Sequence, residues 1–147
     1  MRISIASDHG GFNLKEIIKK HLEDKYDIID YGCFNLDSCD YPDFAYKAAL
    51  AVSQKEADFG IVVCTTGIGV SITANKVKNI RCALLTDIES AKLTRLHNDS
   101  NMLALGAKNV SEELALKIVD MFLSTPFSGE ERHQRRIDKM MKIEKEN

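Results

Sequence analysis

The segment VVCTTGIGVSITANK, from Val62 to Lys76, contains a cysteine and two glycines between an apolar run and a helical pattern. Gly67 and Gly69 allow a sharp turn whose N–H groups point outward at a helix N-terminus, where the helix dipole favours an anion. The same terminus stabilises the thiolate of a cysteine. Cys64 is therefore a candidate base beside an anion-binding loop. The alternative is an ordinary tight turn with Cys64 as a buried strand-end residue.

A carboxylate and an imidazole follow the first apolar run, RISIASD. Asp8 and His9 stand there, before Gly10 and Gly11. A strand-end aspartate can equally cap the helix that follows. The functional interpretation is favoured because the carboxyl ends of parallel strands lie at one edge of a sheet, which places this loop beside the Cys64 loop.

Two arginines share one helical face in the C-terminal segment GEERHQRRIDKMMKIEKE. Arg132 and Arg136 are four residues apart, so their side chains are neighbours on a helix. Two guanidinium groups side by side suit a phosphate dianion through paired, charge-assisted hydrogen bonds. The alternative is a solvated helix in which the arginines pair with Glu130, Glu131 and Asp138.

His97 and Asn98 belong to RLHNDSN, at the junction between a predicted helix and the last predicted strand. Such a junction lies at the amino edge of a parallel sheet, roughly 17 Å from Cys64, which is one strand length. One chain cannot easily bring these residues together. A site that uses both has to be shared between two subunits. The alternative for a histidine at a turn is a cap or a surface residue.

Five short β-rich runs alternate with amphipathic segments along the chain. The runs are Arg2 to Asp8, Tyr26 to Gly32, Phe59 to Thr65, Arg81 to Asp87 and Asn101 to Ala107. The helical patterns lie at 12–23, 41–55, 69–77, 88–97 and 111–124, with a further charged helix from about 129. Strict alternation predicts a parallel sheet covered on both faces. We therefore expect a three-layer α/β/α sandwich of the Rossmann-like or flavodoxin-like type plus a C-terminal helix.

Length and composition predict one soluble, cytoplasmic domain over residues 1–147. The net charge of −2 offers no field for a polyanion, so nucleic acid is not an expected partner. The first residues turn polar too soon for a signal peptide, and no apolar run approaches the roughly 20 residues that span a bilayer. The four cysteines form no CxxC pair and no zinc-like spacing with histidine, so we expect free thiols and no metal site.

Five motifs occur together: SDHGGF, DYPDFA, CTTGIGVSITANK, HNDSN and RHQRR. In this order they resemble the ribose-5-phosphate isomerase B family, within a wider group that includes galactose-6-phosphate and allose-6-phosphate isomerases. The resemblance covers nearly the whole chain. It implies an aldose–ketose isomerase that acts on a small sugar phosphate without metal or organic cofactor. It also implies a homodimer or tetramer with active sites built from two chains.

The resemblance assigns roles to individual residues. Cys64 corresponds to the catalytic base, with Thr66 in the same catalytic loop, and His97 corresponds to the residue that assists ring opening. The implied substrate-binding residues are Asp8, His9, Tyr41, Thr65, Gly67, Ile68, Gly69, Asn98, Lys108, Arg132 and Arg136. Tyr41 could line the pocket or simply pack before Pro42.

Two residues depart from the pattern of that family. Thr65 replaces the first glycine of the usual Cys-Gly-Thr-Gly loop, which preserves the N–H donors only where the backbone does not need a positive φ. Lys108 stands where arginine is frequent, so a point charge replaces a planar fork. A glutamate base occurs at the position of Val70 in one branch of the family, which leaves Cys64 as the candidate base here.

The expected reaction interconverts ribose 5-phosphate and ribulose 5-phosphate through a cis-enediolate. Arg132 and Arg136 hold the phosphate with the help of His9, Cys64 moves the proton, and the N–H groups of Thr66 to Gly69 stabilise the developing charge.

Other interpretations remain open. A hexose 6-phosphate or a tetrose phosphate is the alternative substrate, and a phosphate-binding module without turnover is the alternative class of protein. The sequence does not assign a role to Cys33 or Cys39.

Overall fold

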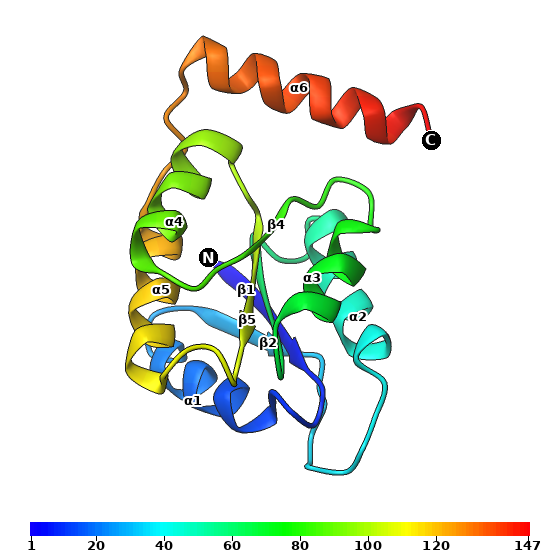
Figure 1. Cartoon of the computed structure of the whole chain (residues 1–147), viewed down its shortest axis with the longest axis vertical. Coiled ribbons are helices and arrows are strands. Elements are labelled where there is room, and N and C mark those ends of the chain that lie inside the picture. The colour runs from blue at the N-terminus through cyan, green and yellow to red at the C-terminus, as the bar shows by residue number, and fades with distance from the viewer.

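The computed structural model describes all 147 residues as a five-stranded parallel sheet with helices on both faces (Figure 1). The strands are β1 (Arg2–Ser7), β2 (Asp27–Asp30), β3 (Phe59–Cys64), β4 (Cys82–Leu84) and β5 (Met102–Gly106), in the order β2-β1-β3-β5-β4. The helices are α1 (Phe12–Leu22), α2 (Tyr41–Ser53), α3 (Ile68–Asn75), α4 (Ile88–Leu93), α5 (Glu112–Ser124) and α6 (Glu131–Lys145). The predicted α/β sandwich is confirmed.

Alternating side chains of the central strand β3 divide the core into two parts. Ile61 and Val63 face α1 and α5, whereas Val62 and Cys64 face α2 and α3. Figure 1 shows α2 and α3 on one side of the sheet and α1, α4 and α5 on the other. Cys64 therefore ends a buried strand on the face that α3 covers.

Helices α4 and α5 each begin with a side-chain cap. The Ser111 hydroxyl accepts a hydrogen bond from the Leu114 N–H at 3.1 Å and caps α5. An Asp87 carboxylate oxygen accepts one from the Ser90 N–H at 2.6 Å and caps α4. Each cap satisfies an N–H group that a helix leaves without an internal partner.

The predicted fourth helix is divided in two. Residues 88–93 form α4, and the chain then widens into a π-helical turn, η1 (Thr94–Asn98), that ends at Asp99 with a φ of 44°. The left-handed conformation of Asp99 ends the helix, because its backbone angles differ from those of a right-handed helix. Aspartate is one of the few residues besides glycine that adopt this conformation readily. His97 and Asn98 lie in this irregular turn.

The edge strand β4 is shorter than predicted. It covers three residues and pairs only with β5. On its outer side the Asn75 side chain accepts from the Cys82 N–H at 2.8 Å and donates to the Cys82 carbonyl at 3.0 Å. The amide of Asn75 thus occupies backbone groups that an edge strand would otherwise expose.

A buried ion pair joins α1 to the end of β2. The Lys15 side chain is fully buried, and its ammonium donates to the Asp30 carboxylate at 2.6 Å. Burial acts to raise the pKa of Asp30. Hydrogen bonds from Lys15, the Gly32 N–H and Lys19 outweigh burial, so the pKa of Asp30 lies below its usual value.

We expect Asp30→Ala to lower the free energy of unfolding by about 3 kcal/mol, because it leaves the buried ammonium of Lys15 without its partner. Urea unfolding followed by circular dichroism measures the change. Asp27→Ala is the matched control on the same strand, since Asp27 pairs with Arg2 on the exposed surface and should change stability by at most about 1 kcal/mol. Equal effects of the two substitutions would contradict this prediction.

Helix α6 stands apart from the three layers. Figure 1 shows it lying across one end of the molecule, and its contacts with the other elements are mainly with η1. Its buried residues are His133 and Ile137. None of the helices combines the length and apolar character needed to cross a membrane.

Candidate active site

Three strand-end loops meet at the carboxyl edge of the sheet. The Asp8 N–H donates to the Val63 carbonyl at 3.3 Å, which joins the end of β1 to the end of β3. The Lys108 N–H donates to the Thr65 carbonyl at 2.9 Å, which joins the residues after β5 to the Cys64 loop. The structure thus brings Asp8, Thr65 and Lys108 together around one edge; the strand-end argument predicts this for Asp8 and Thr65, whereas Lys108 is implied only by the resemblance.

The sulfur of Cys64 accepts a backbone hydrogen bond at the start of α3. The Gly67 N–H donates to Cys64 Sγ at 3.1 Å. Gly67 has a φ of 77°, and a Cβ there would lie 2.8 Å from the Gly106 nitrogen, so only glycine fits this turn. An N–H of a helix N-terminus that is directed at sulfur stabilises negative charge on it.

Cys64 is also deeply placed, with 5% of the residue exposed. It belongs to the core on the α2 and α3 side, as the alternative interpretation of this cysteine expected. Both features therefore coexist: a buried strand-end position and a charge-stabilising N–H contact.

The backbone accepts Thr65 without strain. The non-glycine residues with a positive φ are Lys55, Asn79 and Asp99, so Thr65 has an ordinary backbone conformation. Its departure from the family pattern therefore preserves the N–H donors of the loop. The added side chain occupies the space beside Gly10, where a Cβ would collide with Thr65 Oγ1.

Asp8 and His9 are oriented by local hydrogen bonds. Asp8 Oδ1 accepts from the Gly11 N–H at 3.0 Å, so this carboxylate shapes the turn into α1. Asp8 Oδ2 makes no hydrogen bond within the chain, which leaves it free for a ligand. His9 Nδ1 lies 3.2 Å from the donating N–H of Cys39. The acceptor role of Nδ1 places the proton of neutral His9 on Nε2.

The Tyr41 ring lies against the first turn of α3. A Cβ on Gly69 would lie 2.6 Å from Cε1 and Cζ of this ring. Tyr41 therefore borders the Cys64 loop, and Gly69 is small because the ring approaches it closely. This contact favours the first of the two roles considered for Tyr41.

Asn109 is a residue of this edge that the motifs did not single out. Its side-chain amide donates to the Thr66 carbonyl at 3.4 Å. It lies in the turn after β5, so inspection of every strand end, rather than the first and third, would have found it. The Thr66 hydroxyl oxygen accepts from the Ile68 N–H at 3.3 Å, so its hydrogen can be donated to a ligand.

The second group of predicted residues lies at the opposite edge. His97 and Asn98 precede β5, whereas Cys64 pairs with Gly106 at the far end of that strand. At about 3.3 Å per residue, the five-residue strand places roughly 17 Å between the two ends. The chain by itself does not bring His97 to Cys64.

The two predicted phosphate-binding arginines are exposed on α6, on the side of His97. Arg132 pairs with Glu130 at 3.2 Å, as the solvated-helix alternative expected. Arg136 makes no ion pair within the chain. The two guanidinium groups thus differ, and Arg136 is the one without an acidic partner.

His133 attaches α6 to this edge. Its ring centroid lies 4.4 Å from that of His97, and its Nδ1 lies 2.7 Å from the Ser128 hydroxyl. Burial lowers the pKa of His133, and the nearby charges of His97 and Arg132 lower it further. The contact gathers His97 and the α6 arginines into one group at the amino edge.

The hollows in the surface lie away from the Cys64 loop. Two hollows of about 1060 and 800 Å³ open between α2 and α3 and beneath α6, respectively, and Cys64 lines neither. No group of three or more His, Cys, Asp or Glu side chains could hold a metal ion. All four cysteines are free thiols.

Comparison with known proteins decides the family. The family described as Ribose/Galactose Isomerase matches residues 3–140. The chain belongs to this family. Ribose-5-phosphate isomerase B of Escherichia coli is 43% identical over 144 residues, which cover 97% of this chain and 96% of that protein. A Bacillus subtilis relative that carries only the broader name of sugar phosphate isomerase is 48% identical and covers 100% of this chain and 99% of its own length.

Solved structures of the ribose/galactose isomerase family share the whole fold. Ribose-5-phosphate isomerase B of Clostridium thermocellum is 50% identical with a TM-score of 0.97, and 99% of each chain is covered. The Mycoplasma genitalium ribose-5-phosphate isomerase B, solved with bound ribulose 5-phosphate, is 45% identical with a TM-score of 0.94 and coverage of 99% and 97%. The chain is a sugar phosphate isomerase of this family, as its motifs predict.

Proposed function

We propose that the protein interconverts ribose 5-phosphate and ribulose 5-phosphate. The observation that carries this proposal is the Gly67 N–H directed at Cys64 Sγ, 3.1 Å away, beside the strand-end residues Asp8 and His9. The relative solved with ribulose 5-phosphate supports the choice of a pentose phosphate. The proposed chemistry uses side chains and backbone groups of the protein, without metal or organic cofactor.

In the proposed mechanism Cys64 is the base. Its thiolate removes the proton from C2 of the open-chain aldose, and the electron pair forms the C1–C2 double bond of a cis-enediolate. The π pair of the C1 carbonyl moves onto O1 as the enediolate forms. Return of the proton from Cys64 to C1, together with transfer of the O2 hydroxyl proton to O1, yields the ketose with its C2 carbonyl. One base serves both carbons because it lies over one face of a planar intermediate.

The loop after Cys64 stabilises the charge of the intermediate. The N–H groups of Thr66 and Gly69 make no hydrogen bond within the chain and lie at the start of α3, where the helix dipole favours an anion, whereas those of Gly67 and Ile68 are directed at Cys64 Sγ and Thr66 Oγ1. The Thr66 hydroxyl adds a donor of its own. Removal of one such donor typically costs about 3 kcal/mol of transition-state stabilisation, so this loop is the largest single contribution we assign.

We further propose that a second copy of the chain completes each site. His97 then assists ring opening, and Asn98 binds the sugar. Arg132 and Arg136 of that copy hold the phosphate, with His9 of the first copy beside them. The separation of the two groups at opposite sheet edges supports this arrangement.

Exposed apolar side chains also support assembly with a second copy. On α6, Met140 is 46% exposed and Ile143 is 62% exposed, and both line the hollow beneath that helix. Leu84, near the Cys64 loop, is 41% exposed. Burial of such surface against another copy contributes about 25 cal/mol per Å².

An assay of the purified protein against a panel of sugar phosphates tests the proposed function. We expect the highest kcat/KM with ribose 5-phosphate, and lower values with allose 6-phosphate, galactose 6-phosphate and a tetrose phosphate. Each adds or removes part of the carbon chain between the fixed phosphate and Cys64. A higher kcat/KM for a hexose 6-phosphate would replace the proposed substrate.

The departures at Thr65 and Lys108 make this substrate panel informative. Thr65 adds bulk to the loop, and Lys108 offers a point charge where a fork is frequent. Binding of ribose 5-phosphate without turnover, unchanged by alkylation of the cysteines, would instead indicate a phosphate-binding module.

A further inference from the structure

We propose that Arg81 is a positioning residue for His97 and Asn98, an inference that rests on the proposed shared site. Arg81 comes from the loop before β4 and is distant in sequence from the HNDSN motif. Its side chain is 17% exposed and extends across the end of η1. The side chain of Arg81 binds the backbone of the turn, and it acts through that backbone.

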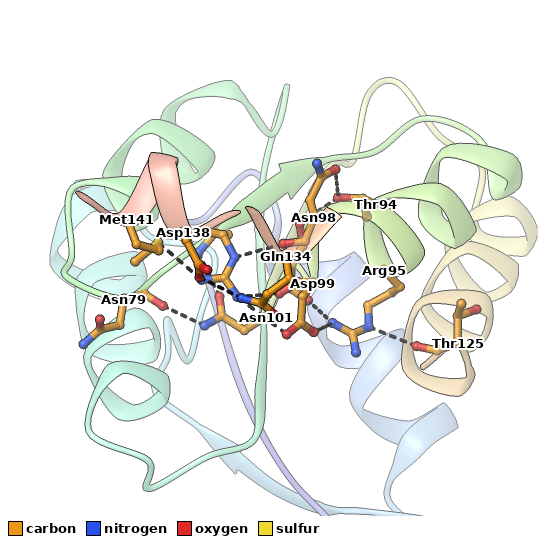
Figure 2. A network of polar contacts seen from close by, with 12 residues as sticks. Asn79, Thr94, Arg95, Asn98, Asp99, Asn101, Thr125, Gln134, Asp138 and Met141 are labelled. Atoms are coloured by element: carbon orange, nitrogen blue, oxygen red, sulfur yellow. Dashed lines mark hydrogen bonds and ion pairs between the residues drawn. The ribbon is translucent and has the colours of Figure 1, made fainter. Parts of the chain in front are cut away.

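Arg81 binds the two carbonyl groups at the end of η1. Its Nε donates to the Asn98 carbonyl and its second terminal nitrogen to the Asp99 carbonyl, each at 2.9 Å. Figure 2 shows Asn98 and Asp99 within one polar network. A helix end leaves its last carbonyls without internal partners, and here one planar guanidinium satisfies two of them.

Arg95 holds the same turn from the inside. Its NH1 donates to Asp99 Oδ1 at 2.8 Å and to the Ser100 carbonyl at 2.7 Å. Its Nε donates to the Thr125 carbonyl at 3.0 Å, as Figure 2 shows. The guanidinium lies 4.8 Å from the centroid of the Phe59 ring. Arg95 is thus buried in the core, and Arg81 binds the same turn from the side nearer the solvent.

Arg81 is itself fixed by its backbone. Its N–H donates to Asn101 Oδ1 at 2.9 Å, and the Asn101 amide donates to the Asn79 carbonyl at 2.8 Å. Its remaining terminal nitrogen lies 3.4 Å from Met141 Sδ on α6. One side chain therefore links the HNDSN turn to the helix that carries Arg132 and Arg136.

The hydrogen bond from Arg81 fixes the backbone carbonyl of Asn98 and thereby the direction of the Asn98 side chain. Asn98 Oδ1 accepts from the Thr94 hydroxyl at 3.1 Å, which leaves its amide hydrogens for the sugar of a neighbouring copy. The preceding residue, His97, has its backbone in the same turn. A shift of about 1 Å in such groups costs about 100-fold in rate, because the reacting atoms lose their alignment.

Arg81→Gln tests this inference, since glutamine cannot span the Asn98 and Asp99 carbonyls. We expect a folded, assembled protein whose kcat for ribose 5-phosphate falls about 10- to 100-fold. Arg81→Lys should recover part of this loss, because lysine reaches one carbonyl as a point donor. A kcat for Arg81→Gln within twofold of wild type would overturn the proposal.

Mixed oligomers separate positioning from general damage. A Cys64→Ala chain is defective only in the residues at the carboxyl edge of the sheet. A His97→Ala chain is defective only in the residues at the amino edge. If Arg81 acts through His97 and Asn98, an Arg81→Gln chain is defective only at the amino edge. Co-produced with the Cys64→Ala chain it should restore about a quarter of wild-type activity, but with the His97→Ala chain it should restore none.

The pair of Cys64→Ala and His97→Ala chains is the control for the shared site. Restoration by this pair but not by Cys64→Ala with Arg81→Gln would mean that Arg81 damages both groups, which overturns the positioning role. Failure of the control pair itself would overturn the shared site instead. The two failures are therefore distinguishable in one experiment.

Discussion

Cys64→Ala protein should fold and bind ribose 5-phosphate but lose turnover by about 10²- to 10⁴-fold, the range that a positioned base contributes. Alanine keeps the strand end and the Gly67 turn but removes the sulfur that the Gly67 N–H contacts. The measurements are kcat by the appearance of ribulose 5-phosphate, binding by calorimetry, and the fold by circular dichroism.

Cys82→Ala is the matched control. Cys82 is also a free thiol that begins a strand of the same sheet, and it takes no part in the Cys64 loop. Its replacement should leave kcat within about twofold of wild type. Turnover near the wild-type value in the Cys64→Ala protein would remove Cys64 from the mechanism.

The second large effect is recovery of activity from two inactive chains. Cys64→Ala and His97→Ala proteins should each be strongly impaired, yet their co-production should restore about a quarter of wild-type activity. Half of the Cys64 positions and, independently, half of the His97 positions are intact in such a mixture. About one site in four therefore combines an intact Cys64 with an intact His97 from another copy.

A chain that carries both substitutions provides the control. Mixed with either single variant, it supplies neither missing group, so activity should stay at the level of the single variant. Full activity of the His97→Ala protein by itself, or no recovery in the mixture of single variants, would mean that the site is not shared through His97.

Much of the fold could be predicted from the sequence, and so could the candidate site residues at the carboxyl edge of the sheet. Alternation of apolar runs and amphipathic helices fixes a parallel sheet, because each crossover has to cover a face. The rule that ligands bind beyond the carboxyl ends of strands then groups Asp8, His9 and Cys64. The same reasoning places His97 at the opposite, amino edge of the sheet.

Other parts of the site depend on contacts that periodicity does not encode. The π-helical turn interrupts a segment with a continuous helical pattern, because Asp99 and the side chains of Arg81 and Arg95 determine its end. Arg81 comes from a segment whose apolar character predicted a strand. Asn109 and the Cys39 N–H likewise act through contacts between loops distant in sequence.

The contact between Thr65 and Gly10 couples the side chains that two loops can carry. With threonine at 65, a methyl group at position 10 collides with Thr65 Oγ1, whereas the next nearest atoms lie at an ordinary 3.4 Å. Alanine at position 10 is therefore disfavoured with threonine at 65, and it would not meet this collision with glycine at 65. The residue in one loop thus limits the residues that the other loop accepts.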